Sequence, residues 1–224
     1  DSTQEPQPLG HKGPERIPCT AEAAVDAGLS LVFLATPPEV SMELSAAFIG
    51  AGLRVVDLSG AFRLGTPENY KHWYKQEHTQ PALLAEAVYS IPEFHRASVA
   101  KARLLSNPGC YPTAANLAIR PLVQAGVIDP ARGVVCDAKS GVSGAGRKAS
   151  LKTAFSEVTE NFSAYSILDH RHVPEVLQNS GLDEENFLFT AQLIPIHRGI
   201  LETVYFRAQG IGDSADLLQI YLNA

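Results

Sequence analysis

A strand, a helix and a second strand follow one another near the start of the chain, and this order constrains the fold most. Residues 29–35 (LSLVFLA) are a continuous apolar run, which predicts a strand buried on both faces. Residues 39–51 have an amphipathic pattern that predicts a helix, with Gly52 as its C-cap. Residues 53–58 then form a second strand. Short connections around a crossover helix predict a parallel, doubly wound sheet.

The later segments predict more strands and helices in a second, mixed region. Two strong strand patterns near the C-terminus are separated by only three residues, so we expect them to pair as antiparallel neighbours. The remaining expected elements are an irregular stretch with one or two short helices over 66–90, helices over 92–102, from 114 and from 214, and strands over 103–105, 133–139, 187–196 and 200–208.

Composition excludes several classes of protein. The 224 residues carry a net charge of −6 and no dense Lys/Arg run, which argues against nucleic-acid binding. No apolar run reaches the ~18 residues of a membrane span, and residues 1–18 read as a polar surface loop. Three cysteines are an odd number without paired zinc spacing, so we expect a reducing compartment, the cytoplasm.

The segment 106–113 (SNPGCYPT) places a cysteine on a turn between a strand and a helix. Pro108 and Gly109 predict the turn, and Pro112 is well tolerated in the first turn of a helix. Cys110 is therefore expected at a helix N-terminus, where unpaired N–H groups and the helix dipole favour the thiolate. A thiolate is a nucleophile, whereas an isolated cysteine is more often a small buried apolar residue. The turn favours covalent catalysis by sulfur.

A histidine cluster over residues 169–175 (DHRHVPE) offers the thiolate an acid–base partner. His170 and His172 are two residues apart, so an extended segment would point both the same way. Glu175 would then orient one imidazole in a Cys–His–Glu arrangement. The spacing equally suits a solvated loop before a helix that begins near Pro174. A zinc pair is a further option, but no second cluster supplies the remaining ligands, so we expect no metal site.

Two other features point to anion binding. The loop over residues 140–147 (SGVSGAGR) is rich in glycine, which lets backbone N–H groups approach a phosphate or a flat ring. It matches neither the dinucleotide fingerprint nor a P-loop. Arg63 and Arg198 each follow a strand in a glycine-containing turn, and a guanidinium suits phosphate or carboxylate. As isolated arginines they are equally typical of a protein surface.

Together these motifs resemble one family. SNPGCYPT, SGVSGAGR, HRHVPE, LSGAFRL, and the pair LIPI and HRGILET match the N-acetyl-gamma-glutamyl-phosphate reductase family, relatives of aspartate-semialdehyde dehydrogenase. The resemblance covers about residues 29–206, and SNPGCYPT with HRHVPE is its most specific part. It implies an α/β chain with a partial Rossmann-like parallel-sheet domain. An α+β substrate and dimerisation domain follows, as in glyceraldehyde-3-phosphate dehydrogenase.

The resemblance implies NADPH-dependent reduction of N-acetylglutamyl 5-phosphate to the 5-semialdehyde in arginine biosynthesis, through a thioester on Cys110. His172 is the implied acid–base group, and His170 is a second candidate or a substrate ligand. The Cys110 N–H and the Asn107 side chain would bind the oxyanion. The positions implied to contact NADP(H) are Thr36, Pro37, Ser140, Ser143 and Gly144, and those implied for substrate phosphate and carboxylate are Arg63 and Arg198.

Two departures from the family pattern modify this expectation. Ala61 stands where family members usually carry Asp before Phe-Arg, which changes the setting of Arg63. The opening strand and glycine-rich dinucleotide loop of the family, and its returning C-terminal tail, are missing from the pattern. We therefore expect a truncated chain: a partial NADP-binding domain over 1–110, a catalytic α+β domain over 111–208 and the start of a C-terminal region over 209–224.

Other readings of the motifs stay open. An aminoadipyl-phosphate reductase of lysine biosynthesis differs by one methylene in the substrate, which leaves little trace in a motif. A non-catalytic fragment that keeps the fold is an alternative of another class. The expected partners are a small acyl phosphate and a second copy of the chain in a homo-oligomer, without nucleic acid or membrane.

Overall fold

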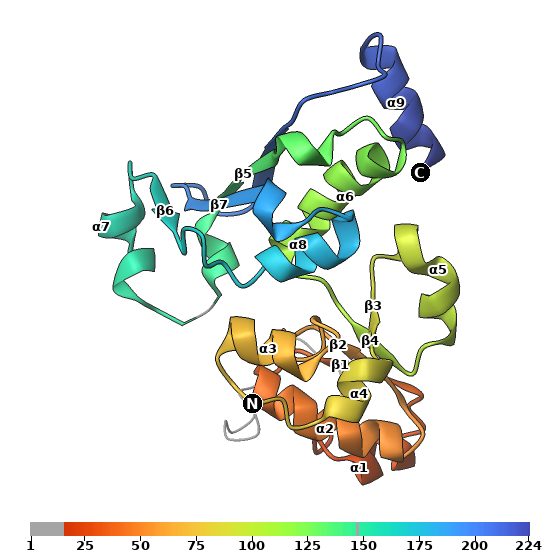
Figure 1. Ribbon diagram of the computed structural model, residues 1–224. Helices are drawn as coiled ribbons and strands as arrows, with labels where there is room; N and C mark the ends of the chain where they lie inside the picture. Colours follow the sequence, from red (N-terminus) through yellow and green to blue (C-terminus); the bar gives the residue numbers. More distant parts are fainter. Residues whose placement is uncertain (1–15, 147) are drawn as a thin grey trace. The chain divides into compact units, whose positions relative to one another are not determined.

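The computed structural model describes residues 16–146 and 148–224, which form two compact units (Figure 1). The first unit holds the described residues up to Pro67 and residues 77–107, and the second holds residues 68–76 and 108–224. Residues 1–15 of the expected polar loop and Arg147 of the glycine-rich motif lie outside the described residues. The division after Asn107 falls close to the boundary expected after residue 110, while residues 68–76 and 209–224 join the second unit.

The first unit is built on a parallel sheet. Its strands lie in the order β1 (Leu31–Leu34), β2 (Arg54–Asp57), β4 (Leu104–Ser106) and β3 (Val88–Tyr89). Every neighbouring pair is parallel, which confirms the expected parallel sheet. The helices of this unit are α1 (Ala21–Asp26), α2 (Pro38–Gly50), α4 (Pro81–Glu86) and α5 (Pro92–Lys101).

Strand β1 is less buried than its composition suggests. Leu34 is 2% exposed, but Phe33 is 63% exposed, so the prediction of burial on both faces is wrong. The reason is position: β1 is at the edge of the described sheet and pairs with β2. An apolar run reports the tendency of a segment to be buried, whereas the elements packed against it decide which side chains are covered.

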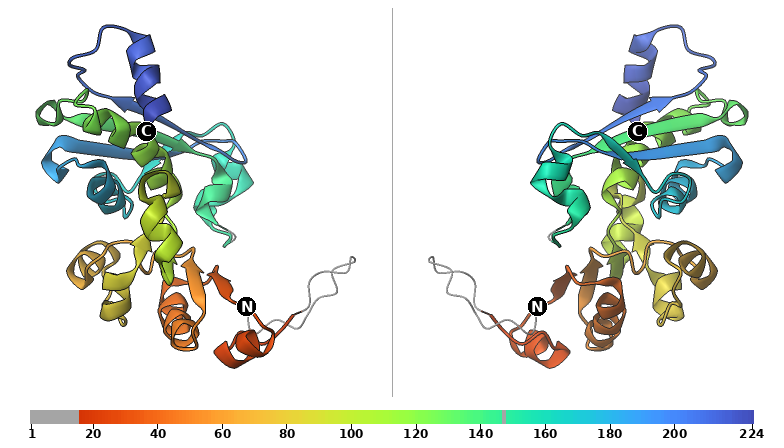
Figure 2. Two further views of the ribbon diagram at one scale, coloured as in Figure 1. Left: turned by 90° about the vertical axis from the view of Figure 1, so that its right-hand side faces the viewer. Right: turned by 90° about the vertical axis from the view of Figure 1, so that its left-hand side faces the viewer.

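The second unit has a mixed sheet in the order β6 (Ser163–Tyr165), β7 (Phe187–Leu193), β5 (Val134–Ser140) and β8 (Ile200–Tyr205). β7 runs parallel to β5, and β8 runs antiparallel to it (Figure 2). The α-helices are α3 (Pro67–Tyr74, almost all in this unit), α6 (Cys110–Gln124), α7 (Phe155–Val158), α8 (Val173–Ser180) and α9 (Ser214–Asn223). Short 3₁₀ helices are η1 (Pro130–Arg132), η2 (Val142–Ala145), η3 (Leu151–Thr153) and η4 (Glu184–Asn186).

The expected pairing of the last two strands is wrong, because β5 lies between β7 and β8. The segment that connects β7 to β8 crosses the C-terminal end of β5. It forms backbone hydrogen bonds with residues 141 and 142, which directly follow β5. Val142 N–H donates to the Ile196 carbonyl at 2.9 Å, and Gly141 N–H donates to the Gly199 carbonyl at 2.9 Å. A side chain at position 141 would put its Cβ 2.8 Å from the Arg198 nitrogen, so this crossing requires glycine.

The core of the second unit lies on one face of this sheet. Residues of β5 alternate between buried and more exposed positions, and Cys136 and Ala138 are fully buried. The Cys136 thiol donates to the Glu202 carboxylate at 3.5 Å, and burial raises the pKa of Glu202 to about 8. Cys136 is therefore a core residue. No helix in the described part of the chain is both long enough and apolar enough to cross a membrane.

Candidate functional site

The cysteine motif folds as its sequence predicts. β4 ends at Ser106, and α6 begins at Cys110 after Gly109, whose backbone is extended. The Thr113 N–H and hydroxyl both donate to the Gly109 carbonyl, at 3.0 and 2.8 Å, which closes the first turn of the helix. The Cys110 thiol is exposed. The nucleophile candidate therefore lies at a helix N-terminus and is accessible to a ligand.

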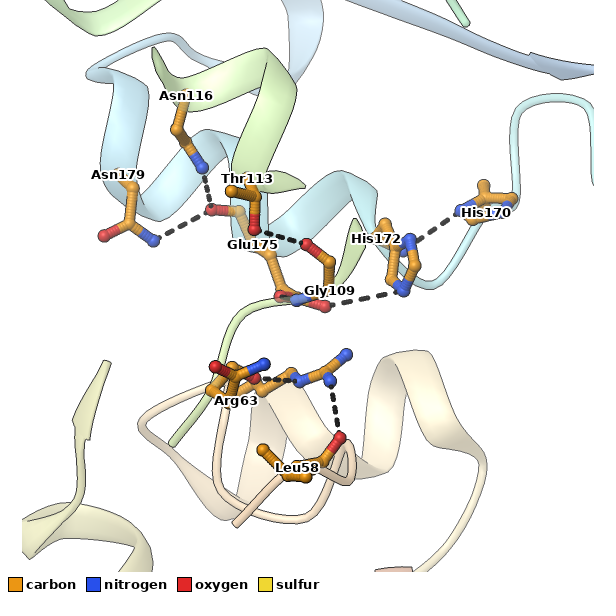
Figure 3. Close-up of polar contacts among 10 residues, drawn as sticks. Leu58, Arg63, Gly109, Thr113, Asn116, His170, His172, Glu175 and Asn179 are labelled. Carbon is orange, nitrogen blue, oxygen red and sulfur yellow. Dashed lines mark hydrogen bonds and ion pairs between the residues drawn. The ribbon is translucent and has the colours of Figure 1, made fainter. Parts of the chain in front are cut away.

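A buried carboxylate, that of Glu175, lies beside the turn that precedes Cys110 (Figure 3). Glu175 is 0% exposed, and its Oε2 accepts the Gly109 N–H at 2.9 Å. A buried carboxylate is costly without such partners, so this hydrogen bond satisfies both groups. The main-chain carbonyl of Glu175 accepts the side-chain amides of Asn116 at 3.3 Å and Asn179 at 2.9 Å. The contacts with Gly109 and Asn116 tie α8 to the first turns of α6, and the contact with Asn179 lies within α8.

His172 lies against the same turn. It is the N-cap of α8 and 6% exposed, and its Nε2 is 3.8 Å from Glu175 Oε1. A Cβ at position 109 would lie 2.7 Å from this Nε2. Only glycine at position 109 therefore lets the imidazole reach the backbone directly before Cys110. Glu175 and His172 are brought together as the sequence predicts, and the solvated-loop alternative does not describe this buried pair.

His170 is arranged differently from the expectation. The segment turns at residues 171–172 rather than running extended, so the extended geometry is wrong, although both rings line the same cavity with their centroids 4.9 Å apart. The turn lets His170 Nδ1 accept the His172 N–H at 3.2 Å, as Figure 3 shows. His170 is 6% exposed, and burial, with a smaller effect of Arg171, lowers its pKa to about 4.

Aromatic side chains that sequence reasoning missed surround His170. Its ring centroid is 5.7 Å from Tyr111, 5.5 Å from Tyr165 and 5.2 Å from Phe189. The Tyr165 hydroxyl donates to the Tyr111 hydroxyl at 3.2 Å, which donates to the Gln192 carbonyl at 3.2 Å. Burial raises the pKa of both tyrosines, so they stay neutral. Tyr111 could have been found from the sequence because it directly follows Cys110. Tyr165 lies in no motif, so nothing in the local sequence indicates that it belongs to the site.

A cavity of about 730 Å³ opens beside the thiol within the second unit. Its lining includes the predicted residues Cys110, Ser140, Gly144, His170 and His172. Four charged residues outside the predicted site also line it: Lys152, Glu157, Asp169 and Arg171. Ser143 and Arg198, which were selected, are not among its lining residues within the described part of the chain.

The other candidates belong to the first unit. The Arg63 guanidinium is buried and donates to the main-chain carbonyls of Asn107 at 2.8 Å and Leu58 at 3.2 Å. Thr36 follows β1, and its hydroxyl is 2.8 Å from the Ser41 hydroxyl. Pro37 is the N-cap of α2. The roles expected of these residues and of Asn107 stay predictions.

No group of three or more His, Cys, Asp or Glu side chains suits a metal ion within residues 16–146 and 148–224. The site offers a thiol, an imidazole–carboxylate pair and side-chain hydrogen-bond donors. Such a set suits acyl transfer through a covalent intermediate.

Two models of known protein families match the chain. One, described as "Semialdehyde dehydrogenase, dimerisation domain", matches residues 110–224. The other, described as "Semialdehyde dehydrogenase, NAD binding domain", matches residues 4–102. The matches cover both units of the structure.

Similar curated proteins share one name. The N-acetyl-gamma-glutamyl-phosphate reductase of Nitrosococcus oceani is 44% identical over 202 residues, which are 89% of this chain and 58% of that protein. The protein of the same name from Magnetococcus marinus is 47% identical over 193 residues, 85% of this chain and 55% of that protein. The chain thus spans little more than half the length of these relatives.

Solved structures confirm the fold. Aspartate semialdehyde dehydrogenase II from Vibrio cholerae matches with a TM-score of 0.61 at 15% identity, covering 86% of this chain and 59% of that one. The Candida albicans enzyme, solved with NADP, also matches with a TM-score of 0.61 at 15% identity, covering 94% and 62%. This likeness confirms the two-part α/β fold that the motifs implied.

Proposed function

The chain belongs to the semialdehyde dehydrogenase family, and from this premise we propose that it reduces an acyl phosphate to an aldehyde. The substrate we propose is N-acetylglutamyl 5-phosphate, because the similar curated proteins are named N-acetyl-gamma-glutamyl-phosphate reductase. The reaction consumes NADPH and a proton and releases phosphate. With this substrate it is a step of arginine biosynthesis.

One observation carries the proposal: His172 Nε2 lies against Gly109, the residue before the exposed Cys110. An acyl-transfer enzyme needs a nucleophile, an acid–base group beside it and a third group that orients the second. Cys110, His172 and Glu175 supply these three functions within one unit. This arrangement supports a catalytic protein over a fragment that only keeps the fold.

The first half of the reaction acylates Cys110. The sulfur attacks the acyl carbon, a C–S bond forms, and the bond from carbon to the phosphate oxygen breaks. Phosphate leaves with that electron pair, so no oxidant or reductant is needed for this half. His172 takes the thiol proton and later returns it to the sulfur, when the carbon–sulfur bond breaks and the aldehyde leaves, while Glu175 keeps the imidazole oriented through the 3.8 Å contact.

The second half reduces the thioester, and the residues present fit a nicotinamide cofactor. When bound, this cofactor supplies a hydride to the thioester carbon. Gly144 lines the cavity, and a Cβ there would lie 2.7 Å from Ser140 Oγ, so a side chain at this position would have to displace the hydroxyl. Such a surface accepts a flat ring. Ser140, Ser143 and Gly144, with Thr36 and Pro37 after a parallel strand, are the residues we propose to hold NADP(H).

Arginines are the proposed ligands of the substrate's anionic groups. Arg63 would bind phosphate, since its guanidinium is already held by two carbonyls and so costs little further ordering. For the substrate carboxylate, Arg198 is the predicted ligand, and Arg171 is a second candidate because it lines the cavity. The Asn107 side chain and the Cys110 N–H are the proposed donors to the oxyanion.

The proposal is tested with the intact protein that carries this sequence. N-acetylglutamate semialdehyde, phosphate and NADP⁺ should produce NADPH absorbance, with the rate using NAD⁺ measured in parallel. We expect the aminoadipate analogue and the deacetylated analogue to react at least tenfold more slowly by kcat/KM. Equal or faster reaction of the aminoadipate analogue would favour the lysine-pathway alternative, and no reaction with any of the three would contradict the function.

We also propose that the chain forms a homo-oligomer through the open face of the β6–β7–β5–β8 sheet. The matching family model is a dimerisation domain. Leu188, Leu201 and Tyr205 are 54–65% exposed on the face opposite the core. The ion pair of Asp137 with Lys139 lies on the same face of β5. One acid and one base suit a two-fold interface, where each would meet its opposite on the second copy.

Leu188→Glu is expected to weaken this association at least tenfold, because it places a charge on a face that two copies would desolvate. Sedimentation velocity over a concentration series would measure the change. The control is Leu222→Glu, which alters a 71% exposed leucine of α9 outside this face. Equal behaviour of the two variants would contradict the proposed face.

We place the protein in the cytoplasm. Cys19 and Cys110 are exposed free thiols, and the proposed reaction requires Cys110 to stay reduced.

A further inference from the structure

His170 is the residue of the site whose part in the reaction the family resemblance leaves open. It is 6% exposed, lines the cavity beside Cys110 and comes from the loop that precedes α8. Its two ring nitrogens have different surroundings, and this difference decides what the side chain can do.

The backbone settles which nitrogen carries the proton. Nδ1 of His170 accepts the His172 N–H at 3.2 Å, so Nδ1 holds a lone pair. A neutral imidazole with an acceptor at Nδ1 carries its hydrogen on Nε2. Among the described residues, no hydrogen bond uses the Nε2–H, while the ring borders the cavity. The donor is therefore available to a bound molecule.

The surroundings keep this ring neutral. Tyr111 from α6, Tyr165 from β6 and Phe189 from β7 pack around it, and the His172 ring is 4.9 Å away. Burial, and to a smaller extent the positive charge of Arg171, lowers the pKa of His170, and the carboxylates of Glu157 and Asp169 also line the cavity. Both tyrosines stay neutral because burial raises their pKa values. The ring therefore has a fixed tautomer and a fixed orientation.

We propose that His170 binds the acyl oxygen of the substrate through its Nε2–H, as a neutral hydrogen-bond donor to the oxyanion formed when Cys110 attacks. The assignment rests on the proposed function and adds a donor from the second unit. Negative charge develops on the acyl oxygen in both tetrahedral steps, and a preorganised donor stabilises it without reorganising. A neutral imidazole is an established means of polarising a carbonyl group. In this role His170 exchanges no proton, which leaves acid–base work to His172.

Two substitutions distinguish the contributions of the two ring nitrogens of His170. His170→Asn can place an amide oxygen where Nδ1 accepts the His172 N–H, but it has no group at the Nε2 position. His170→Gln can place an amide N–H near the Nε2 position, but it loses the Nδ1 acceptor. If the Nε2–H binds the oxyanion, Asn should slow thioester formation by about 10²-fold, whereas Gln should stay within about tenfold of wild type.

Thioester formation is measured without cofactor on the intact protein, with N-acetylglutamyl 5-phosphate and mass spectrometry of Cys110. Thermal unfolding of each variant reports whether the fold is kept. A wild-type rate in His170→Asn, or a loss in Gln larger than in Asn, would overturn the donor role and leave His170 as a positioning residue for His172. Absence of a thioester in the wild type would instead contradict the proposed function.

A second readout does not depend on the substrate. ¹⁵N NMR of the imidazoles should show His170 with a hydrogen on Nε2 and an unprotonated Nδ1 from pH 5 to 8. A titration of His170 within this range, or a hydrogen on Nδ1, would overturn the inference whatever the activity. The pH–rate profile of His170→Gln should keep the limbs of the wild-type profile, because His172 is the group that exchanges protons.

Discussion

Cys110→Ser is expected to lower the rate of semialdehyde oxidation by at least about 10³-fold. A serine hydroxyl is barely ionised near neutral pH, and an oxygen ester accepts hydride less readily than a thioester. The measurement is NADPH formation from the semialdehyde, phosphate and NADP⁺ with the intact protein. Mass spectrometry should detect an acyl adduct on the wild type and none on the variant.

The fold should be unaffected by this substitution, which makes the loss interpretable. The Cys110 side chain is exposed, and exposed substitutions usually change the free energy of unfolding by less than about 0.5 kcal/mol. Cys19→Ser is the matched control, because Cys19 is also an exposed free thiol but lies in the first unit. A Cys110→Ser protein with a tenth or more of wild-type activity would contradict the thioester mechanism.

Glu175→Ala is expected to destabilise the second unit by about 2–4 kcal/mol and to remove most activity. The variant leaves the buried Gly109 N–H without its acceptor and opens space under the nucleophile turn, where Glu175 is 0% exposed. Urea denaturation should show a lower midpoint with an unchanged slope. The activity should fall by more than about 10²-fold, since His172 loses its orienting group.

Glu175→Gln is the matched control that separates hydrogen bonding from charge. An amide oxygen can still accept the Gly109 N–H, so its stability should stay within about 1 kcal/mol of wild type. A carboxylate 3.8 Å from Nε2 favours a protonated imidazole. Its removal should therefore move the histidine limb of the pH–rate profile to lower pH. Equal stability of the Ala and Gln variants would show that the Gly109 hydrogen bond is not what Glu175 contributes.

Local chemistry in the sequence was sufficient to predict much of the secondary structure. The helix expected over 39–51 is α2, Pro38–Gly50, and the helix expected over 92–102 is α5, Pro92–Lys101. The helix expected from Ser214 is α9. Each of these helices starts at a proline or after a capping residue, whose effects act within a few residues of the chain.

The stretch over 66–90 contains an element that local sequence patterns do not predict. It contains α3 and α4, as expected, but also the two-residue strand β3, Val88–Tyr89. β3 exists because β4 offers parallel partners to it. No periodicity can develop in two residues, so the sequence holds no strand signal there. Burial of β1 and the neighbours of β7 and β8 were mispredicted for the same kind of reason.

By itself, the sequence determined that a cysteine would stand at a helix N-terminus, because Pro108, Gly109 and Pro112 restrict their own backbone angles. Only the tertiary structure decided which side chains surround that cysteine. The hydrogen bond from Gly109 to Glu175 joins residues 66 positions apart. We expect distinct roles for His170 and His172 because a turn separates them and aromatic side chains pack around His170. Contacts between distant segments depend on how whole elements pack, and that information is spread over the entire chain.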